Sequence, residues 1–517
     1  MGTYADLILE NGNITVPEPG IPGTASVAVR GDSIWLIGNE QEIGQVKGRS
    51  TKVIDCRGKT LVPGFNDAHC HLFSYVHKLL SLDLSPAAVR SITDIKEVVR
   101  RKAQTIPEGT WISGTDYNEF YLQEKRHPTR QDLDEAAPNH PVVLSHRSLH
   151  ACVLNSLALR LAGITNESEA PEGGIIERDL NTGEPNGILF EMLGHLREKV
   201  IPPVDKAELD RGLAEANRRY LSLGITSIGE ATHSNDFERW QFYRQMKKSG
   251  IIKSRIYMMW GPASMKQFKE AGLTTGSGDS QLRVGSLKIM LSEATGKLYP
   301  SQTELNEVVL EATEAGFQVA IHAIERNSVE AAIIALERAQ KQYPIIERRH
   351  RIEHCSECPP ELSRRLSLLK SVVVSQPSFV YYSGERYLVQ VSPETQKWLY
   401  AFKSMLDYGV VVAGSSDSPV VPNNPLAGIY AAVTRRAESG QVVSGKEAIS
   451  AGQALNMYTR NAAYATFEEK IKGSLVPGQK ADIVVLSHDP LNTDFTRLKD
   501  IAVEMTLIGG DLVYFTN

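Results

Sequence analysis

Two histidines, His69 and His71, lie two residues apart in the segment VPGFNDAHCHLF, residues 62–73. Successive side chains of a β-strand point to opposite faces, so residues i and i+2 share one face. If this segment ends a strand, both imidazoles point the same way while Cys70 faces outward, and the pair forms half of a metal site, because imidazole binds zinc well. Taken alone, the spacing is weak evidence, and chance placement on a surface loop explains it better than metal binding does.

Other metal-compatible side chains lie in or at the ends of other apolar segments. His322 lies in VAIHAIE, His354 in RIEHCSE and Asp417 in VVVAGSSDSPV. Lys288 lies inside GSLKIML, where an ammonium group is costly unless its charge is removed or paired. Taken singly, these are explained by a core histidine, a helix cap at Asp417 or a lysine that reaches solvent. Taken together, they indicate a single site.

The elements that carry these residues follow an alternating pattern. Short apolar segments are followed by helical ones such as 302–315, 327–341 and 360–370. Eight strands, each followed by a helix, predict an α/β fold, the parallel (β/α)8 TIM barrel, with the site at the carboxyl ends of the strands. The predicted strands are LVPGFNDAHCH, GITSIGEA, SRIYMMW, GSLKIML, FQVAIHAIE, HRIEHCSE, SVVVSQPS and GVVVAGSSD.

The rest of the chain is expected to surround this barrel. Both chain ends contain short alternating strands and tight turns, so 1–61 and 472–517 are predicted to form one small β-sandwich domain. The barrel is predicted at 62–471. Its stretch from about 74 to 205 is too long for a single crossover connection. We expect an inserted subdomain there, over the mouth of the barrel.

The bulk composition limits the class of protein. Hydrophobic residues make up 42% and charged residues 23%, as in soluble globular proteins. The net charge of −5, with basic residues spread along the chain, argues against nucleic acid or a membrane as partner. The segment MGTYADLILENGN lacks the pattern of a secretory signal. The odd number of cysteines, five, then favours reduced thiols and a cytoplasmic location.

The order H-x-H, Lys, His, His, Asp along the predicted strands resembles the amidohydrolase superfamily. LVPGFNDAHCHL, RIEH, GSSDSPV and GSLVPGQKADIVVL resemble its YtcJ-like branch, which includes N-substituted formamide deformylases. PVVLSHRSLHACVLNS and PEGGIIERDLNTGEPNGILFE extend the resemblance, which covers almost the whole chain.

The resemblance implies a metal-dependent hydrolase with one or two metal ions per subunit, usually zinc. The implied ligands are His69, His71, Lys288, His322, His354 and Asp417. Lys288 is implied to be carboxylated on its amine and to bridge two ions, and Asp417 to accept the proton of the attacking water. The expected partner is a small-molecule substrate, and the habit of the superfamily favours a homodimer.

Four further residues are candidates for the substrate pocket. His150 matches a branch histidine that is implied to touch the substrate carbonyl, and a surface histidine is the alternative. Glu230 ends the strand GITSIGEA and could serve as a ligand or as a polar wall. Tyr117 and Tyr381 are candidates for lining the pocket, with loop packing as their alternative.

Two segments depart from the branch and leave the substrate open. LKIMLSEATGKLY replaces a strand that commonly continues into Asp-Gly-Ser-Leu-Gly, and HAIERN replaces His-Ala-Ile-Gly-Asp. The first hypothesis is hydrolysis of the C–N bond of a small amide, such as an N-substituted formamide or N-acyl amine. The second is a cyclic amide or lactone hydrolase or a heterocycle deaminase. The third is a catalytically silent binding protein.

Overall fold

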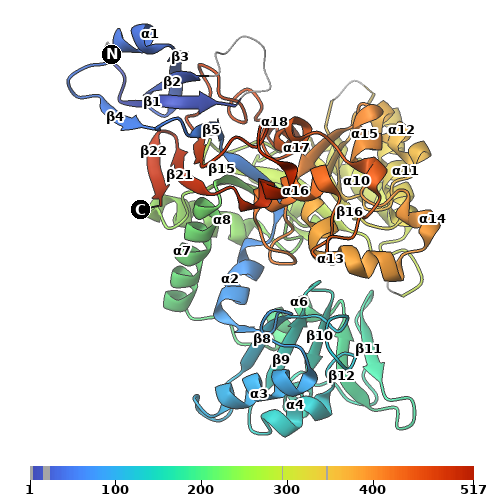
Figure 1. The fold of residues 1–517 in the computed structure, drawn as a ribbon. Coiled ribbons are helices and arrows are strands. Elements are labelled where there is room, and N and C mark those ends of the chain that lie inside the picture. The colour runs from blue at the N-terminus through green and yellow to red at the C-terminus, as the bar shows by residue number, and fades with distance from the viewer. Residues whose placement is uncertain (1–3, 16–23, 294, 345–346, 517) are drawn as a thin grey trace. The chain divides into compact units, whose positions relative to one another are not determined.

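The computed structural model describes residues 4–15, 24–293, 295–344 and 347–516. The chain divides into two compact units, each traced in Figure 1. The first unit comprises Met1–His71, Ala214–Leu291 and Pro300–Asn517. The second unit comprises Leu72–Leu213 and Ser292–Tyr299.

A sheet of eight parallel strands forms the barrel of the first unit. Val, Ile and Ala dominate several of these strands, and nearly all strand residues are buried, as expected for parallel strands covered on both faces. All eight predicted strands are confirmed. They are β6 (Phe65–Cys70), β13 (Ile225–Glu230), β14 (Arg255–Trp260), β15 (Leu282–Met290), β16 (Val319–Ala323), β17 (Arg351–His354), β18 (Val372–Ser375) and β19 (Val411–Gly414).

Backbone hydrogen bonds link the first strand of the barrel to the segment that follows the last. The amide of His71 donates to the carbonyl of Ser418 at 2.8 Å, and the amide of Asp417 donates to the carbonyl of His69 at 2.8 Å. Asp67 on β6 accepts from the amide of Ser416 at 2.9 Å. The barrel is therefore nearly closed, and its seam lies where predicted ligands from both ends of the sheet meet.

Helices follow the strands as the sequence predicts. The expected helices are found as α10 (Gln302–Glu314), α11 (Arg326–Gln342) and α12 (Pro360–Leu369). α10 begins at a capping box in which Ser301 and Glu304 satisfy each other's backbone amides. Because this local signal fixes where the helix starts, the apolar face of α10 meets the core.

Strands from both ends of the chain share a second sheet of the first unit. Its order is β22-β21-β20-β5-β1-β2-β3, with β4 beside β1. Figure 1 shows the N-terminal strands in blue next to the C-terminal strands in red. Residues 1–3, 16–23 and 517 of the predicted terminal domain lie outside the described residues, and the sandwich form stays a prediction. The strands are β1 (Leu7–Ile14), β2 (Thr24–Arg30), β3 (Ser33–Gly38), β4 (Lys52–Asp55), β5 (Thr60–Pro63), β20 (Ile483–Leu486), β21 (Val503–Ile508) and β22 (Asp511–Phe515).

A buried ion pair joins this terminal sheet to the barrel. Arg255 on β14 donates from Nε and Nη2 to Asp482 at 2.7 and 2.8 Å, and the two side chains are only 3% and 4% exposed. We expect Asp482→Ala to lower the free energy of unfolding by about 3–5 kcal/mol, because it leaves a buried guanidinium without its counter-charge. Urea denaturation measures the loss. Asp500→Ala removes the exposed partner of Lys499 and should cost at most about 1 kcal/mol; equal losses would contradict the prediction.

The buried His350, just before β17, should make the free energy of unfolding depend on pH. Its Nδ1 accepts from the amide of Val319 at 3.0 Å. Burial, followed by the charge of Arg348, lowers the pKa of His350 from 6.5 to about 3. The folded chain therefore keeps this ring neutral while the unfolded chain protonates it. Between pH 6.5 and about 3 the unfolded state binds more protons, so the stability contributed here is lost as the pH falls.

His350→Asn tests this sign. The Asn oxygen can still accept from Val319 but does not titrate, so the free energy of unfolding should fall less steeply between about pH 6.5 and 4 than in the wild type. Denaturant titrations at several pH values measure both slopes. Parallel curves for the two proteins would show that His350 does not contribute.

The second unit is built on a mixed six-stranded sheet, in the order β11-β12-β10-β9-β8-β7. Helices α3 (Ile92–Ala103) and α4 (Arg130–Ala136) contribute apolar residues to a core cluster of this unit. The predicted subdomain at about 74–205 falls inside it, and its place over the barrel mouth stays a prediction. The strands are β7 (Leu82–Asp83), β8 (Ile112–Tyr117), β9 (Val142–His146), β10 (Ala151–Leu154), β11 (Ile175–Arg178) and β12 (Pro185–Phe190).

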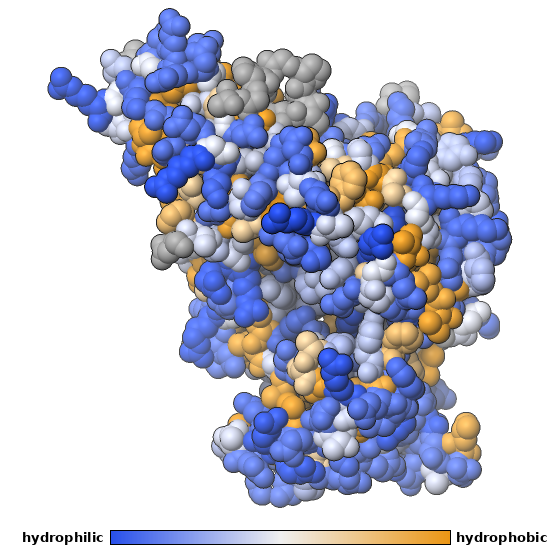
Figure 2. Space-filling model, in the orientation of Figure 1, coloured by the Kyte–Doolittle hydropathy of each residue, from blue (hydrophilic) through white to orange (hydrophobic). Residues whose placement is uncertain are grey.

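Hydrophilic side chains cover most of the face drawn in Figure 2, where apolar side chains appear in small groups. Large exposed apolar residues include Leu180, Leu368 and Val389, and such scattered residues are normal for a folded chain. Among the described residues, no helix combines the length and apolarity that crossing a bilayer requires.

Candidate metal centre

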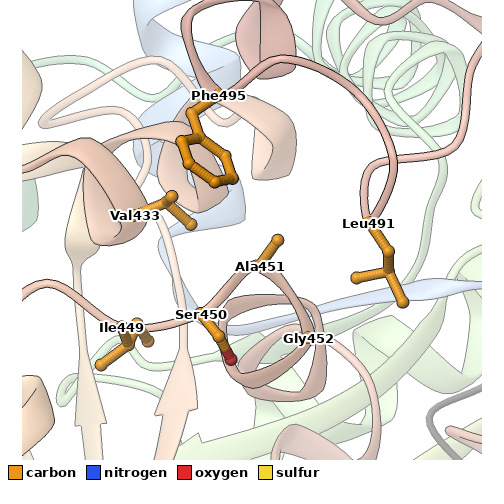
Figure 3. Close-up of a pocket in the computed structure, with 7 residues that line it drawn as sticks. All are labelled: Val433, Ile449, Ser450, Ala451, Gly452, Leu491 and Phe495. Carbon is orange, nitrogen blue, oxygen red and sulfur yellow. The ribbon is translucent and has the colours of Figure 1, made fainter.

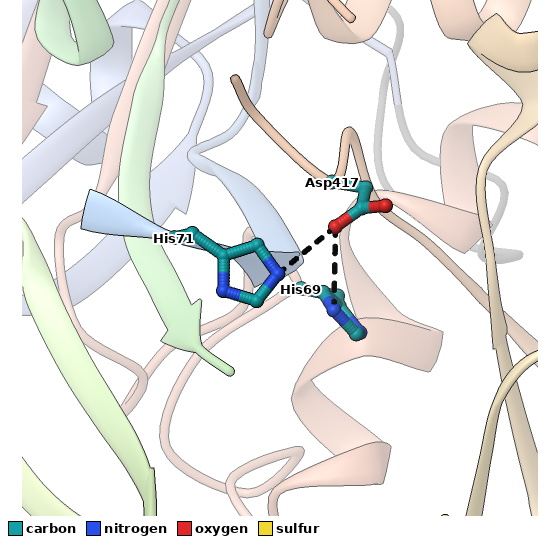
Figure 4. A group of neighbouring side chains, drawn as sticks. All are labelled: His69, His71 and Asp417. Atoms are coloured by element: carbon teal, nitrogen blue, oxygen red, sulfur yellow. Dashed lines mark ion pairs between the residues drawn. The ribbon is translucent and has the colours of Figure 1, made fainter. Parts of the chain in front are cut away.

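His69, His71 and Asp417 form a compact group at the seam of the barrel (Figure 4). One potential ligand atom from each lies within 4.8 Å of the others. Oδ1 of Asp417 is 3.1 Å from Nε2 of His71 and 3.4 Å from Nε2 of His69. Cys70, between the histidines, is fully buried and contacts Tyr220 on α7 (Lys206–Ser222). The alternation predicted for this segment is therefore what brings the two imidazoles together.

The four predicted histidine ligands form a row of rings. The centroids of His71 and His69 are 5.3 Å apart, those of His69 and His354 are 4.9 Å apart, and those of His354 and His322 are 4.5 Å apart. His322 lies on β16 and His354 ends β17. The structure thus brings together four histidines, from β16, from β17 and from the carboxyl end of β6.

Lys288 on β15 is a buried basic residue of this region. It is 1% exposed, and its Nζ has no hydrogen-bond partner among the described residues. Burial lowers its pKa to about 8, although the carboxylates of Glu353 and Asp417 act in the opposite direction. A fraction of the amine is therefore neutral near physiological pH, and only a neutral amine can react with carbon dioxide to form a carbamate.

Two of the predicted ligands have a strained backbone. His354 has φ of 70° and Asp417 has φ of 57°, in the left-handed region that non-glycine residues seldom adopt. Such strain costs on the order of 1–3 kcal/mol per residue and persists where the surrounding structure enforces it, often at functional sites. The amide of Asp417 is held by the carbonyl of His69, which fixes one of the two.

The donor set fits a divalent metal ion. Nδ1 of His69 bonds to Glu353, whose two oxygens also accept from Arg351 at 2.7 and 3.0 Å. Both oxygens of Glu353 thus act as acceptors, and Nδ1 of His69 carries the proton. Burial, and then the charge of Lys288, lowers the pKa of His69 well below its usual value, so its Nε2 presents a lone pair to Asp417. A single proton can bridge only one histidine–aspartate pair, whereas one metal ion can be bound by His69, His71 and Asp417 together.

Several residues of this network escaped prediction. Glu353, Arg351 and Gln376 are buried, polar and bonded to predicted ligands or to their partners. Asp67 accepts from Ser416, next to Asp417. Two signals were available in the sequence. Asp67 stands two residues before His69 and so shares its strand face, and RIEH places two opposite charges inside an apolar strand.

Glu230 lies next to the centre but is already engaged. It is fully buried at the end of β13. Its Oε1 accepts from the hydroxyl of Thr232 at 2.7 Å, and its Oε2 accepts from the amide of Asn235. The Thr232 oxygen is also 3.0 Å from Nδ1 of His71. The carboxylate therefore reaches His71 through Thr232.

The remaining candidates are described by their neighbours within their own units. Tyr381 on α13 (Pro377–Gln390) packs against Tyr430 on α16 (Pro425–Thr434), with ring centroids 5.6 Å apart. In the second unit, Tyr117 is fully buried and bonds through its hydroxyl to His127 at 3.0 Å. Nδ1 of His150 pairs with Glu191 at 2.8 Å. Their roles toward a substrate stay predictions.

A separate pocket of about 470 Å³ lies among the outer helices of the first unit (Figure 3). It is lined by Val433 of α16, Ile449, the start of α17 (Ala451–Met457), Leu491 and Phe495. These side chains are mostly apolar, and none of the predicted ligands is among them. Ser450 adds one hydroxyl to this lining, and the pocket is separate from the candidate metal centre.

Comparison with known proteins agrees with this geometry. The sequence model of the amidohydrolase family matches residues 52–514. The chain is 29% identical to N-substituted formamide deformylase of Arthrobacter pascens over 99% of both chains. It is 28% identical to the putative amidohydrolase YtcJ of Bacillus subtilis, over 95% of this chain and 96% of that relative.

Solved structures share the fold. An uncharacterized metal-dependent hydrolase from Pyrococcus furiosus matches with a TM-score of 0.72 and 25% identity, over 94% of this chain and 100% of that chain. A second one, from Pyrococcus horikoshii, matches with a TM-score of 0.75 and 22% identity, over 95% and 99% of the two chains. Because the family match spans every strand that carries a predicted ligand, this protein belongs to the amidohydrolase family.

Proposed function

We propose that this protein is a metal-dependent hydrolase that cleaves the C–N bond of a small, non-peptide amide. The concrete substrate class is an N-substituted formamide or an N-acyl amine. The observation that carries the proposal is the convergence of His69, His71 and Asp417 within 4.8 Å. The formamide deformylase named among the relatives supports the choice of bond.

Two metal positions are proposed, with zinc as the ion. The first position is defined by His69, His71 and Asp417, and the second position by His322 and His354. Lys288 is proposed to carry a carbamate, because carboxylation turns a costly buried ammonium into an anionic oxygen ligand between the two positions. When bound, zinc lowers the pKa of a water molecule toward neutrality and polarises the carbonyl of the substrate.

The chain itself supplies the proton transfer. Burial raises the pKa of Asp417, but the hydrogen bond with His71 and the nearby rings of His69 and His354 outweigh this and lower it. Asp417 is thus an anion that can take a proton from the attacking water and pass it to the leaving nitrogen. Such positioned proton transfer contributes about 10²–10⁴-fold to a rate.

Metal analysis and a substrate panel test this proposal. The purified protein should hold stoichiometric zinc or a similar ion, and a chelator should abolish hydrolysis. Formate or another carboxylate should appear together with an amine. The proposal would be wrong if the purified protein held no metal and a chelator left its properties unchanged.

A second candidate is a cyclic amide or lactone hydrolase or a heterocycle deaminase. It is favoured by the altered segments after Lys288 and His322 and by a 40% identical stretch of 72 residues shared with adenine deaminase of Rubrobacter xylanophilus. That stretch covers only 14% of this chain. Release of ammonia in the same panel would select deamination, and ring opening without an amine product would select a lactone.

A further inference from the structure

Three histidines of the centre, His69, His71 and His354, have different hydrogen-bond partners at Nδ1. Nδ1 of His69 bonds directly to the carboxylate of Glu353. Nδ1 of His71 meets the hydroxyl of Thr232 at 3.0 Å, and Nδ1 of His354 meets the amide oxygen of Gln376 at 2.8 Å. Partners of this kind set the tautomer and the basicity of a ligating imidazole.

The hydrogen bonds around His71 have only one consistent direction. Both oxygens of Glu230 accept, because the hydroxyl of Thr232 and the amide of Asn235 donate to them. The single proton of Thr232 is thereby used, so its oxygen must accept from Nδ1 of His71. Nε2 of His71, which lies 3.1 Å from Oδ1 of Asp417, is then the nitrogen that can ligate a metal ion, and the carboxylate of Glu230 acts on the ring through one hydroxyl.

The hydrogen bonds around His354 also have one consistent direction, but none of the groups in this chain of contacts is charged. The hydroxyl of Ser415 donates to the carbonyl of Ser375 at 3.0 Å, so its oxygen accepts from Nε2 of Gln376 at 2.9 Å. The Gln376 oxygen must therefore face His354 and accept from its Nδ1. This ring is oriented as firmly as the others, yet its partner is a neutral amide.

We infer that the first position binds its metal ion more tightly than the second, and that Glu230 is a positioning residue that acts on His71 through Thr232. Both histidines of the first position are backed by buried carboxylates, which make an imidazole a stronger donor. At the second position, Nδ1 of His354 bonds to the neutral amide of Gln376 and not to a carboxylate. This inference rests on the proposed function, because it concerns the same centre.

Zinc titration of the metal-free full-length chain against a chromophoric chelator tests the inference without measuring activity. Thr232→Val keeps the shape of the side chain but removes the relay, and should weaken the tighter binding step about tenfold. Thr232→Ser keeps the hydroxyl and should leave that step unchanged. Gln376→Leu should weaken only the weaker step, or have no effect if a single ion binds.

A further variant keeps the test decisive if Thr232→Val does not fold. Glu230→Gln preserves size, but with its oxygen toward Asn235 its amide donates to Thr232 and reverses the relay. It should therefore also weaken the tighter step. The inference would be wrong if Gln376→Leu weakened the tighter binding step. It would also be wrong if Thr232→Val and Glu230→Gln both left that step unchanged. Neither result would contradict the proposed function. A wild-type chain that binds no zinc would overturn the proposed function as well.

Discussion

Asp417→Asn should lower kcat/KM for the amide substrate by about 10³-fold, within the range for loss of a general base. The Asn side chain has nearly the same size and can still contact the metal position, but it cannot take a proton from water. Asparagine also tolerates the left-handed backbone conformation better than most residues, and Asp417 has φ of 57°. The fold should therefore survive the change.

Steady-state kinetics and metal analysis of one preparation separate the two roles of Asp417. Retained metal with lost turnover identifies the proton acceptor, whereas loss of both identifies a ligand only. Asp407→Asn makes the same chemical change at an exposed residue that pairs with Lys403, and its activity should equal that of the wild type. Turnover within tenfold of the wild type in Asp417→Asn would remove this residue from the reaction.

Lys288→Met should make the metal-free protein more stable and the enzyme inactive. Lowering the pKa of this buried amine from 10.5 to about 8 corresponds to about 3 kcal/mol of lost stability, which an apolar side chain of similar length recovers. The same change removes the proposed carbamate. Less metal per chain and a rate at least about 10²-fold lower are expected, because orientation of the reacting groups is lost.

Denaturation of the metal-free protein and metal analysis of the loaded protein measure the two effects. Lys403→Met, on the exposed face of α15 (Phe402–Asp407), provides the matched control and should change stability by no more than about 0.5 kcal/mol. If Lys288→Met kept its full metal content and activity, the lysine would not belong to the centre, and a mononuclear site would be favoured.

The features that the sequence could predict depend on residues that lie close together along the chain. The H-x-H spacing at His69, the lysine inside an apolar strand and the histidine of RIEH are each visible within a few residues. Strand alternation converts those spacings into directions, and the resemblance to a known superfamily assigned them to one centre. The eight barrel strands followed from the same short-range alternation of apolar and helical segments.

What the sequence could not predict depends on contacts between distant segments. Glu353 bonds to His69 across 284 residues, and Thr232 meets His71 across 161 residues. No spacing rule indicates which buried carboxylate lies behind which imidazole, since this depends on how neighbouring strands align. Glu230 illustrates the limit: its position at a strand end was visible, but its engagement with Thr232 and Asn235 was not.

The seam between β6 and the segment after β19 also bears on how the protein is made. Asp67 and Ser416, which bond across it, are 349 residues apart in the sequence. At about 5–20 residues per second, a ribosome needs roughly 20–70 seconds to go from one to the other. During that interval the nascent chain presents His69 and His71 without Asp417. The group of His69, His71 and Asp417 can therefore assemble only late in biosynthesis, after the segment that follows β19 has been synthesised.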